Sequence, residues 1–385
     1  MSRRCWSLLV LLLLFPVAAR ADAPPLRKPV QVVQDRAGFA KKLRAMGHSK
    51  KGGIAQAKAE RDDANTLSFP HFTSSFTYNG TRYPYTMVGH APSSGQSARI
   101  RPVLIPLRLN FVYFGDQGDV SVRFDPRRAV NNILNSPLFN DAPFANGTGQ
   151  FGDMLQRATF WNKMDAQHSW HVQFSTPRVL PTIDVQVDPE IGVLFQSGNS
   201  YFGAILFGAM DSTIHTILQL VNVQPDELPI FVTYNTFAEA LGYHDAFVVG
   251  RSDGTDVLQT LIYTSWLEPD LFGDLLADVS TLNHEVGEWL NDPYVNNETP
   301  MWAYPPFNTE CAFNPFLEVG DPQGNGPNYD LFPTVPVRLN GYTYHLQDLV
   351  MLPWFAGEKP SSAQNGWYDF PATNQIRTPF TPCGP

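Results

Sequence analysis

Residues 278–293 read Asp-Val-Ser-Thr-Leu-Asn-His-Glu-Val-Gly-Glu-Trp-Leu-Asn-Asp-Pro. Asp278 and Ser280 are candidate N-caps, and Pro293 would stop a helix shortly after Asn291. The stretch therefore predicts a helix of about three turns.

The predicted helix separates polar chemistry from core contacts. At about 100° per residue, His284, Glu285 and Glu288 spread over about 100° of the helix surface. The apolar residues gather on the opposite side: Val279, Leu282, Val286, Trp289 and Leu290. Charged residues at this spacing are typical of a solvated helix face, and a metal site is the alternative.

The pattern His284-Glu-Val-Gly-Glu288 is one residue away from His-Glu-x-x-His, which places two zinc ligands and a general base on one helix. Glu288 stands where the second histidine would be, and a glutamate is also a zinc ligand. Gly287 is unexpected, because glycine costs about 1 kcal/mol relative to alanine inside a helix. A close approach by another strand or by substrate would explain it.

A second acidic cluster, Leu-Glu-Val-Gly-Asp-Pro at residues 317–322, follows the predicted helix. Glu318 and Asp321 are its two candidate ligands. Glu318 is preferred as the third ligand beside His284 and Glu288, since its longer side chain reaches a helix-borne metal more easily from a separate segment.

Together these motifs resemble those of zincin-type metallopeptidases whose third ligand is a downstream glutamate. They are also similar to secreted bacterial proteins and, more distantly, to plant phosphate-induced proteins of the Exordium type. The similarity covers roughly residues 230–350, and the chain departs from the peptidases at Glu288. It implies an α+β fold with a zincin-like core, in which a mixed sheet precedes the active-site helix.

The resemblance implies a metal-dependent, peptidase-like hydrolase, with zinc or another divalent metal held by His284, Glu288 and Glu318, and with Glu285 as general base. Its substrate would be a peptide or a cell-surface polymer. The alternative is a non-catalytic extracellular module that binds cell wall or carbohydrate on the same scaffold. The chain has no Gly-x-Ser-x-Gly elbow, phosphate-binding loop or dinucleotide fingerprint.

The first 21 residues predict a secretory signal peptide, with Arg3 and Arg4, an apolar run from Leu8 to Val17, and a small-x-small cleavage site ending at Ala21. The apolar run is too short for a membrane anchor. The formal net charge of −9 argues against nucleic acid as a partner. The oligomeric state is left open.

Cysteine usage fits an oxidising compartment. After cleavage only Cys311 and Cys383 remain. The simplest prediction is that they form a disulfide, and a pair of metal thiolates is the alternative.

Residues 22–65 are polar and basic, which predicts a leader that is either an inhibitory pro-segment or a disordered linker. Residues 66–190 predict a strand-rich N-terminal part, and residues 191–385 the zincin-like part. The 33 prolines and 28 glycines indicate a loop-rich and proline-rich protein.

Strands are predicted where Val, Ile, Phe, Tyr and Thr are frequent between turn residues, at 82–90, 101–114, 119–125, 170–175, 183–187, 228–234, 246–249 and 258–264. Helices are predicted at 126–137 and 150–162. Residues 336–346 predict a hairpin with Asn340-Gly341 at its turn.

Other histidines and tyrosines are weaker candidates. His168 and His171 lie at the start of the strand predicted at 170–175. Residues at this spacing point to opposite faces of a strand, so the two histidines are interpreted as structural. His244 is placed in a loop, held by backbone or reaching the site as a substrate ligand. Tyr342, Tyr344 and His345 could supply an electrophilic group opposite the base.

Overall fold

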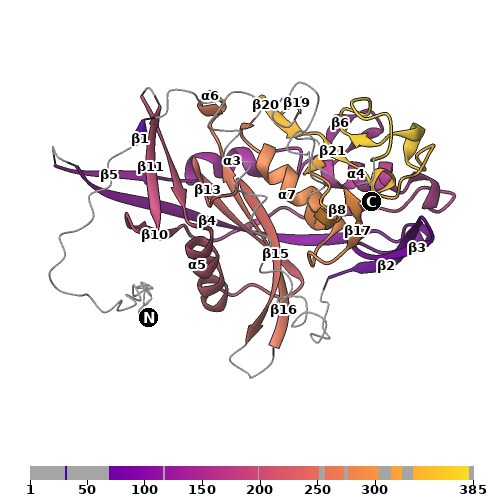
Figure 1. Ribbon diagram of the computed structural model, residues 1–385, viewed down its shortest axis with the longest axis horizontal. Helices are drawn as coiled ribbons and strands as arrows, with labels where there is room; N and C mark the ends of the chain where they lie inside the picture. The colour runs from indigo at the N-terminus through magenta and orange to yellow at the C-terminus, as the bar shows by residue number, and fades with distance from the viewer. Residues whose placement is uncertain are drawn as a thin grey trace, which may run out of the picture.

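The computed structural model describes residues 31–32, 69–115, 118–197, 199–250, 256–272, 276–302, 314–322 and 333–380. These residues form an α+β structure with a mixed sheet (Figure 1). One large hydrophobic core extends from Phe69 to Phe380. Among the described residues, no helix is long and apolar enough to cross a membrane.

The main sheet has the strand order β10-β4-β13-β16-β15. Its strands are β4 (Ala98–Gly115), β10 (Ile183–Val187), β13 (Glu227–Tyr234), β15 (Gly242–Gly250) and β16 (Asp256–Trp266). Strands β10, β4, β13 and β16 run parallel, whereas β15 is antiparallel to β16. Strands β5 (Gly118–Phe124), β8 (Val172–Phe174) and β9 (Arg178–Val179) also pair with β4. The predicted mixed sheet is confirmed, and strands from both predicted parts of the chain contribute to it.

The sheet is covered on both faces around β15. Helix α5 (Phe207–Leu220) lies on the face to which Tyr243 and Phe247 point, since Phe207 packs on Tyr243 and His215 stacks on Phe247. Helix α7 (Ser280–Asn291) contacts β15 and β16 on the other side (Figure 1). Residues of β13 are buried along its whole length, as expected of a strand in the parallel part of a covered sheet.

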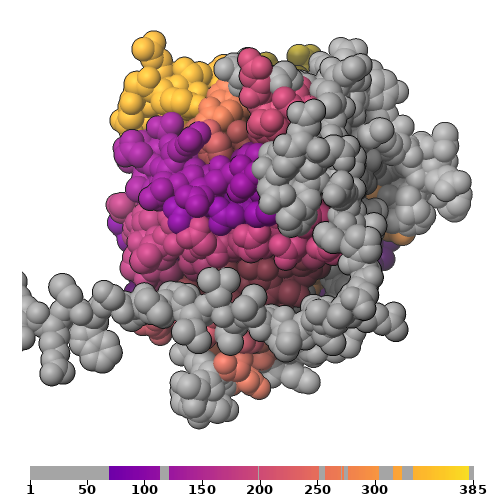
Figure 2. Space-filling model, turned by 90° about the vertical axis from the view of Figure 1, so that its left-hand side faces the viewer, coloured from indigo at the N-terminus to yellow at the C-terminus, as the bar shows by residue number. Residues whose placement is uncertain are grey.

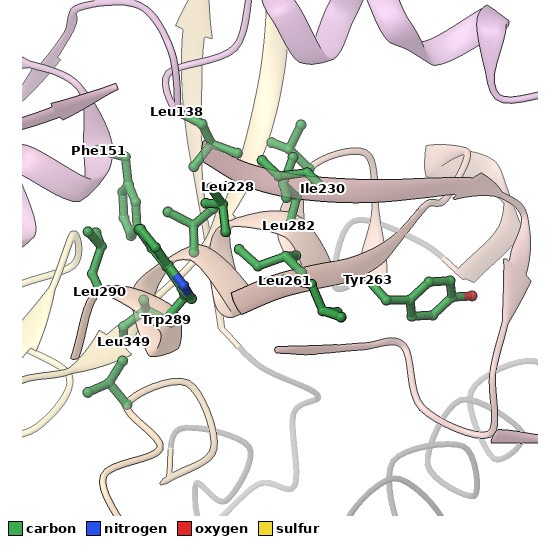
Figure 3. Packing of buried hydrophobic residues seen from close by; sticks show 14 of the residues in the cluster. Leu138, Phe151, Leu228, Ile230, Leu261, Tyr263, Leu282, Trp289, Leu290 and Leu349 are labelled. Atoms are coloured by element: carbon green, nitrogen blue, oxygen red, sulfur yellow. The ribbon is translucent and has the colours of Figure 1, made fainter. Parts of the chain in front are cut away.

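Helix α7 buries its apolar face as predicted. In the cluster drawn in Figure 3, Leu282 lies beside Ile230 of β13 and Leu261 of β16, whereas Trp289 and Leu290 lie toward Phe151 and Leu349. Trp289 and Leu290 are fully buried. A Cβ at Gly287 would lie 2.2 Å from Leu349 Cδ1. Glycine at this position therefore allows a strand to approach the helix closely, which was one of the two explanations expected from the sequence.

The predicted N-caps of this helix are wrong. The cap position is Val279, with no side-chain cap hydrogen bond. Asp278 does accept a hydrogen bond from the Val279 backbone, but its carboxylate also binds the backbone and ring of His345. A contact with a distant strand has thus replaced the local cap.

A second sheet contains β1 (Gln31–Val32), β11 (Gly192–Ser197), β12 (Ser200–Ile205) and β14 (Thr236–Phe237). It carries a small aromatic cluster of its own around Phe202. Figure 2 shows that segments of the N-terminal half, coloured indigo to magenta, form much of one side of the molecule.

The described residues form five further strand pairs: β2 (His71–Tyr78) with β3 (Thr81–Val88), β6 (Ala142–Phe144) with β7 (Gly147–Gly149), β17 (Glu298–Trp302) with β18 (Asn314–Phe316), β19 (Thr334–Leu339) with β20 (Tyr342–Gln347), and β21 (Leu349–Val350) with β22 (Asp369–Phe370). The other α-helices within the described ranges are α3 (Arg127–Leu134), α4 (Phe151–Thr159), α6 (Pro269–Phe272) and α8 (Leu352–Phe355). Short 3-10 helices cover Pro92–Ser94, Trp161–Lys163 and Gln364–Gly366.

The hairpin predicted at 336–346 is confirmed. Asn340 and Gly341 have φ angles of 51° and 82°, as the two central residues of a type I′ turn require. Helices predicted at 126–137 and 150–162 are also present, with shorter bounds.

Several predictions concern residues outside the described ranges. These are the signal peptide, nearly all of the leader at 22–65, and the Cys311–Cys383 disulfide. They stay predictions.

Candidate metal centre

The candidate site lies where α7 faces β15. His284, Glu285 and Glu288 project from one side of α7, and His244 projects toward them from β15. The prediction that His244 lies in a loop is wrong, because residues 242–250 pair with β16 over their full length. Alternation along the strand turns His244 toward α7 and its neighbours Tyr243 and Asp245 toward the other face.

His284 is surrounded by carboxylates. Its Nε2 lies 3.2 Å from Glu288 Oε1, 3.6 Å from Asp321 Oδ1 and 3.9 Å from Glu285 Oε1. Two ligands of one tetrahedral ion with bonds of roughly 2.0–2.2 Å are about 3.3–3.6 Å apart. The separations of His284 from Glu288 and Asp321 therefore fit donors of one metal ion.

The segment 317–322 brings the downstream acids to the helix. Leu317 and Val319 are buried in the core, and the Val319 carbonyl accepts a hydrogen bond from the Val350 backbone. Next to these anchors, Glu318 and Asp321 project toward the α7 residues. The structure groups Asp321 with His284 and Glu288, and it groups Glu318 with His244 and Glu288.

Gly320 permits this segment to lie against the His284 ring. A Cβ at position 320 would be 2.5 Å from His284 Nδ1. The Gly320 backbone N–H donates to Glu288 Oε1 at 3.2 Å, so the same residue also orients the shared carboxylate.

The surroundings of His284 fix its tautomer when the ring is neutral. Gln347 Nε2 donates to the Gly320 carbonyl at 2.6 Å, which leaves Gln347 Oε1 to face His284 Nδ1 at 3.0 Å. A carbonyl oxygen only accepts, so Nδ1 carries the proton and the Nε2 lone pair faces Glu288 and Asp321. This arrangement of an imidazole held by an oxygen acceptor is the usual one for metal-binding histidines.

His244 is held in the same manner from the opposite end of its ring. Its Nε2 donates to the backbone carbonyl of Asp292 at 3.1 Å. Its Nδ1 therefore faces the cluster, 3.5 Å from Glu285 Oε2 and 3.5 Å from Glu288 Oε2. The Asp292 side chain accepts hydrogen bonds from the backbone of Asn296 and Asn297, which fixes the turn that carries this carbonyl.

The polar face of α7 is not solvated. Glu285 and Glu288 are 4% and 3% exposed, and Glu318 and Asp321 are 1% and 4% exposed. The interpretation of these charges as a solvated surface is therefore wrong. Buried carboxylates need compensating charge, which protonated histidines or a metal ion can provide.

In the metal-free protein the histidines provide that charge. Burial alone would lower the pKa of His284, but the charges of Glu288 and Glu285 raise it to about 10. The pKa of His244 is likewise raised well above its usual value, since hydrogen bonds to Glu285 and Glu288 outweigh burial. Burial raises the pKa of Glu285, whereas the pKa of Glu288 is well below its usual range because both histidines outweigh its burial. A divalent ion must displace the imidazole protons to bind.

The late hairpin offers no support for the predicted electrophilic group. Tyr344 donates to the Asn132 carbonyl, and His345 Nδ1 lies 2.6 Å from Asp278 Oδ2. Tyr342 packs on Trp266.

His168 and His171 make contacts that fit the structural interpretation. His168 stacks on Trp161. His171 Nδ1 lies 2.7 Å from Asp153 Oδ2.

Sequence reasoning missed two contributors to the site. His244 was not considered as a metal ligand, although alternation in the strand 242–250 would have placed it opposite Tyr243 and Asp245. Gln347, which holds His284, has no sequence signal of its own, because its role depends on the packing of β20 against α7.

No protein-family model matches the chain, and neither the curated proteins nor the solved structures contain a significant match.

Proposed function

We propose that this protein is a secreted, metal-dependent hydrolase of peptidase-like chemistry. The observation that carries the proposal is the set of buried donors around His284 Nε2, with Glu285 beside them. His284 and Glu288 would hold the ion. Asp321 takes the third position beside them, where the sequence favoured Glu318, because Asp321 is the acid grouped with His284. Zinc or another divalent metal fits this donor set.

Glu285 is suited to act as the general base. It is buried, which raises its pKa above the usual value of a glutamate, and a carboxylate of higher pKa is a stronger base. It takes a proton from the attacking water and transfers it to the leaving amine. A bound divalent ion supplies acidification of the water and polarisation of the scissile carbonyl.

The charges of the proposed ligands lead to an expectation for the rate of hydrolysis. One neutral imidazole and two carboxylates leave a divalent ion formally neutral, whereas two imidazoles and one carboxylate leave it positive. A less positive centre acidifies water less. We expect slow hydrolysis at neutral pH with zinc, or a preference for another divalent metal.

Two substitutions test the proposal by metal analysis and by turnover of a peptide library. His284→Ala removes a donor, so bound metal should fall. Glu285→Gln removes only the base, so metal should remain and turnover should be lost. His90→Ala and the exposed Glu190→Gln are matched controls that should change neither readout. Full activity in Glu285→Gln would rule out the mechanism.

A non-catalytic binding module on the same scaffold is the second candidate. It is favoured by the depth of the cluster, since the four carboxylates are at most 4% exposed. A structural ion would be enclosed in this manner. Tightly bound metal without turnover of any peptide in the library would support this function instead.

A further inference from the structure

We propose that the cluster holds two divalent cations bridged by Glu288. One ion lies between His284, Glu288 and Asp321, and the other between His244, Glu288 and Glu318. The inference rests on the metal-binding part of the proposed function and extends it from one ion to two.

Glu288 directs its two oxygens to different histidines. Oε1 lies 3.2 Å from His284 Nε2, and Oε2 lies 3.5 Å from His244 Nδ1. Both separations are close to the roughly 3.3–3.6 Å expected between two ligands of one tetrahedral ion. A carboxylate that gives one oxygen to each of two ions is suited to the separation of about 3.5–4 Å found in two-metal sites.

Each ion has its own histidine, oriented independently. His284 is held by Gln347 on β20, and His244 by the Asp292 carbonyl after α7. In both rings the nitrogen that does not face the cluster is bonded to an oxygen acceptor. A single ion held by His284, Glu288 and Asp321 would make no use of the orientation of His244.

Each ion also has its own terminal carboxylate. Asp321 completes the group of His284, and Glu318 completes the group of His244. Both acids come from one segment of six residues. The choice between Glu318 and Asp321 that the sequence left open therefore has a structural answer, because each serves a different ion.

The charge of the cluster fits two ions. Glu285, Glu288, Glu318 and Asp321 are all buried, and two neutral histidines add no charge. One divalent ion balances half of the four negative charges, whereas two balance all of them. Uncompensated charge in a buried cluster is costly, so full occupancy should be the more stable state.

Glu285 lies next to both ions in this arrangement. Its carboxylate oxygens are 3.5 Å from His244 Nδ1 and 3.9 Å from His284 Nε2. It can therefore serve as base for a water activated by either ion. The oxygen-rich donor set suits manganese and iron as well as zinc.

The experiment is a titration of the full chain, stripped with a chelator, with Mn²⁺ alone. Bound Mn²⁺ is counted by elemental analysis after desalting, and electron paramagnetic resonance reports whether bound ions are magnetically coupled. We expect two ions per chain with a coupled signal. His244→Ala and Glu318→Gln should each reduce the count to one, with an isolated-ion spectrum, while His90→Ala keeps two.

The outcomes separate this inference from the proposed function. One ion in the wild type, unchanged in His244→Ala, overturns the two-ion centre and leaves a one-ion hydrolase intact. No bound ion in the wild type overturns both. The wild-type count and spectrum decide the question even if His244→Ala fails to fold, and Glu318→Gln provides the second variant.

Discussion

Substitution of Gly320 by alanine should damage the proposed metal site although it replaces none of the ligand residues. The new Cβ would lie 2.5 Å from His284 Nδ1 and 2.6 Å from Cε1. Carbon contacts are optimal at about 3.5–4.0 Å, so the ring or the segment must move by roughly 1 Å. The segment is held on both sides, because Gly320 donates to Glu288 and accepts from Gln347.

A displacement of this size exceeds the tolerance of a metal site, in which ligand distances hold to about 0.2 Å. Substitutions in the groups that orient metal ligands cost about 10–100-fold in metal affinity. We expect a loss in that range for Gly320→Ala, or about 1.4–2.7 kcal/mol of binding free energy. Competition of Zn²⁺ between the protein and a chromogenic chelator measures it.

Gly208→Ala is the matched control. It lies in α5, where an added Cβ meets nothing within 4 Å. Its metal affinity should equal that of the wild type, and its stability should rise by up to about 1 kcal/mol, since alanine favours a helix over glycine. Wild-type metal affinity in a folded Gly320→Ala protein would refute the argument that this segment positions His284.

Two further predictions concern stability. Burial and the neighbouring Asp369 raise the pKa of Asp348 well above its usual value, so its contribution to stability is complete below about pH 3.9 and is lost as pH rises through the raised pKa. The Asp348→Asn variant has no such loss and can still accept the hydrogen bond from the Ala372 backbone. Its free energy of unfolding in urea should therefore exceed that of the wild type by an amount that grows from pH 4.5 to pH 8. Parallel pH dependences of the two unfolding free energies would contradict this. Trp289→Ala removes a fully buried side chain from the core and should lower the free energy of unfolding by about 3–5 kcal/mol. Denaturant unfolding measures this loss. A much smaller loss would mean that the core around α7 collapses into the cavity.

Local patterns predicted much of the secondary structure. The helix 280–291 follows from a periodic apolar face ended by proline, and the hairpin at 336–346 follows from Asn340-Gly341, because only a few residue types adopt two successive positive φ angles. The strands of the parallel sheet were recognisable as short apolar runs. These features depend on residues that are neighbours in the chain.

The composition of the site could be predicted only in part. His284, Glu285 and Glu288 stand out because one helix carries them, and Glu318 and Asp321 because they share a short acidic segment. Whether they bind a metal stays a prediction. The sequence could not show that this helix face is buried, since charged residues at helical spacing are equally typical of a solvated surface.

Tertiary structure alone decided what meets that face. Residues 243–245 were predicted as a loop because they lie between two predicted strands, yet pairing with β16 makes them part of a strand and turns His244 toward α7. The same packing brings Asp321 together with His284, and Glu318 together with His244. The sequence by itself determined which side chains α7 offers, because helix geometry is local. Tertiary contacts of β15 and of the segment 317–322 decided which distant side chains complete the cluster. No local sequence pattern encodes these contacts.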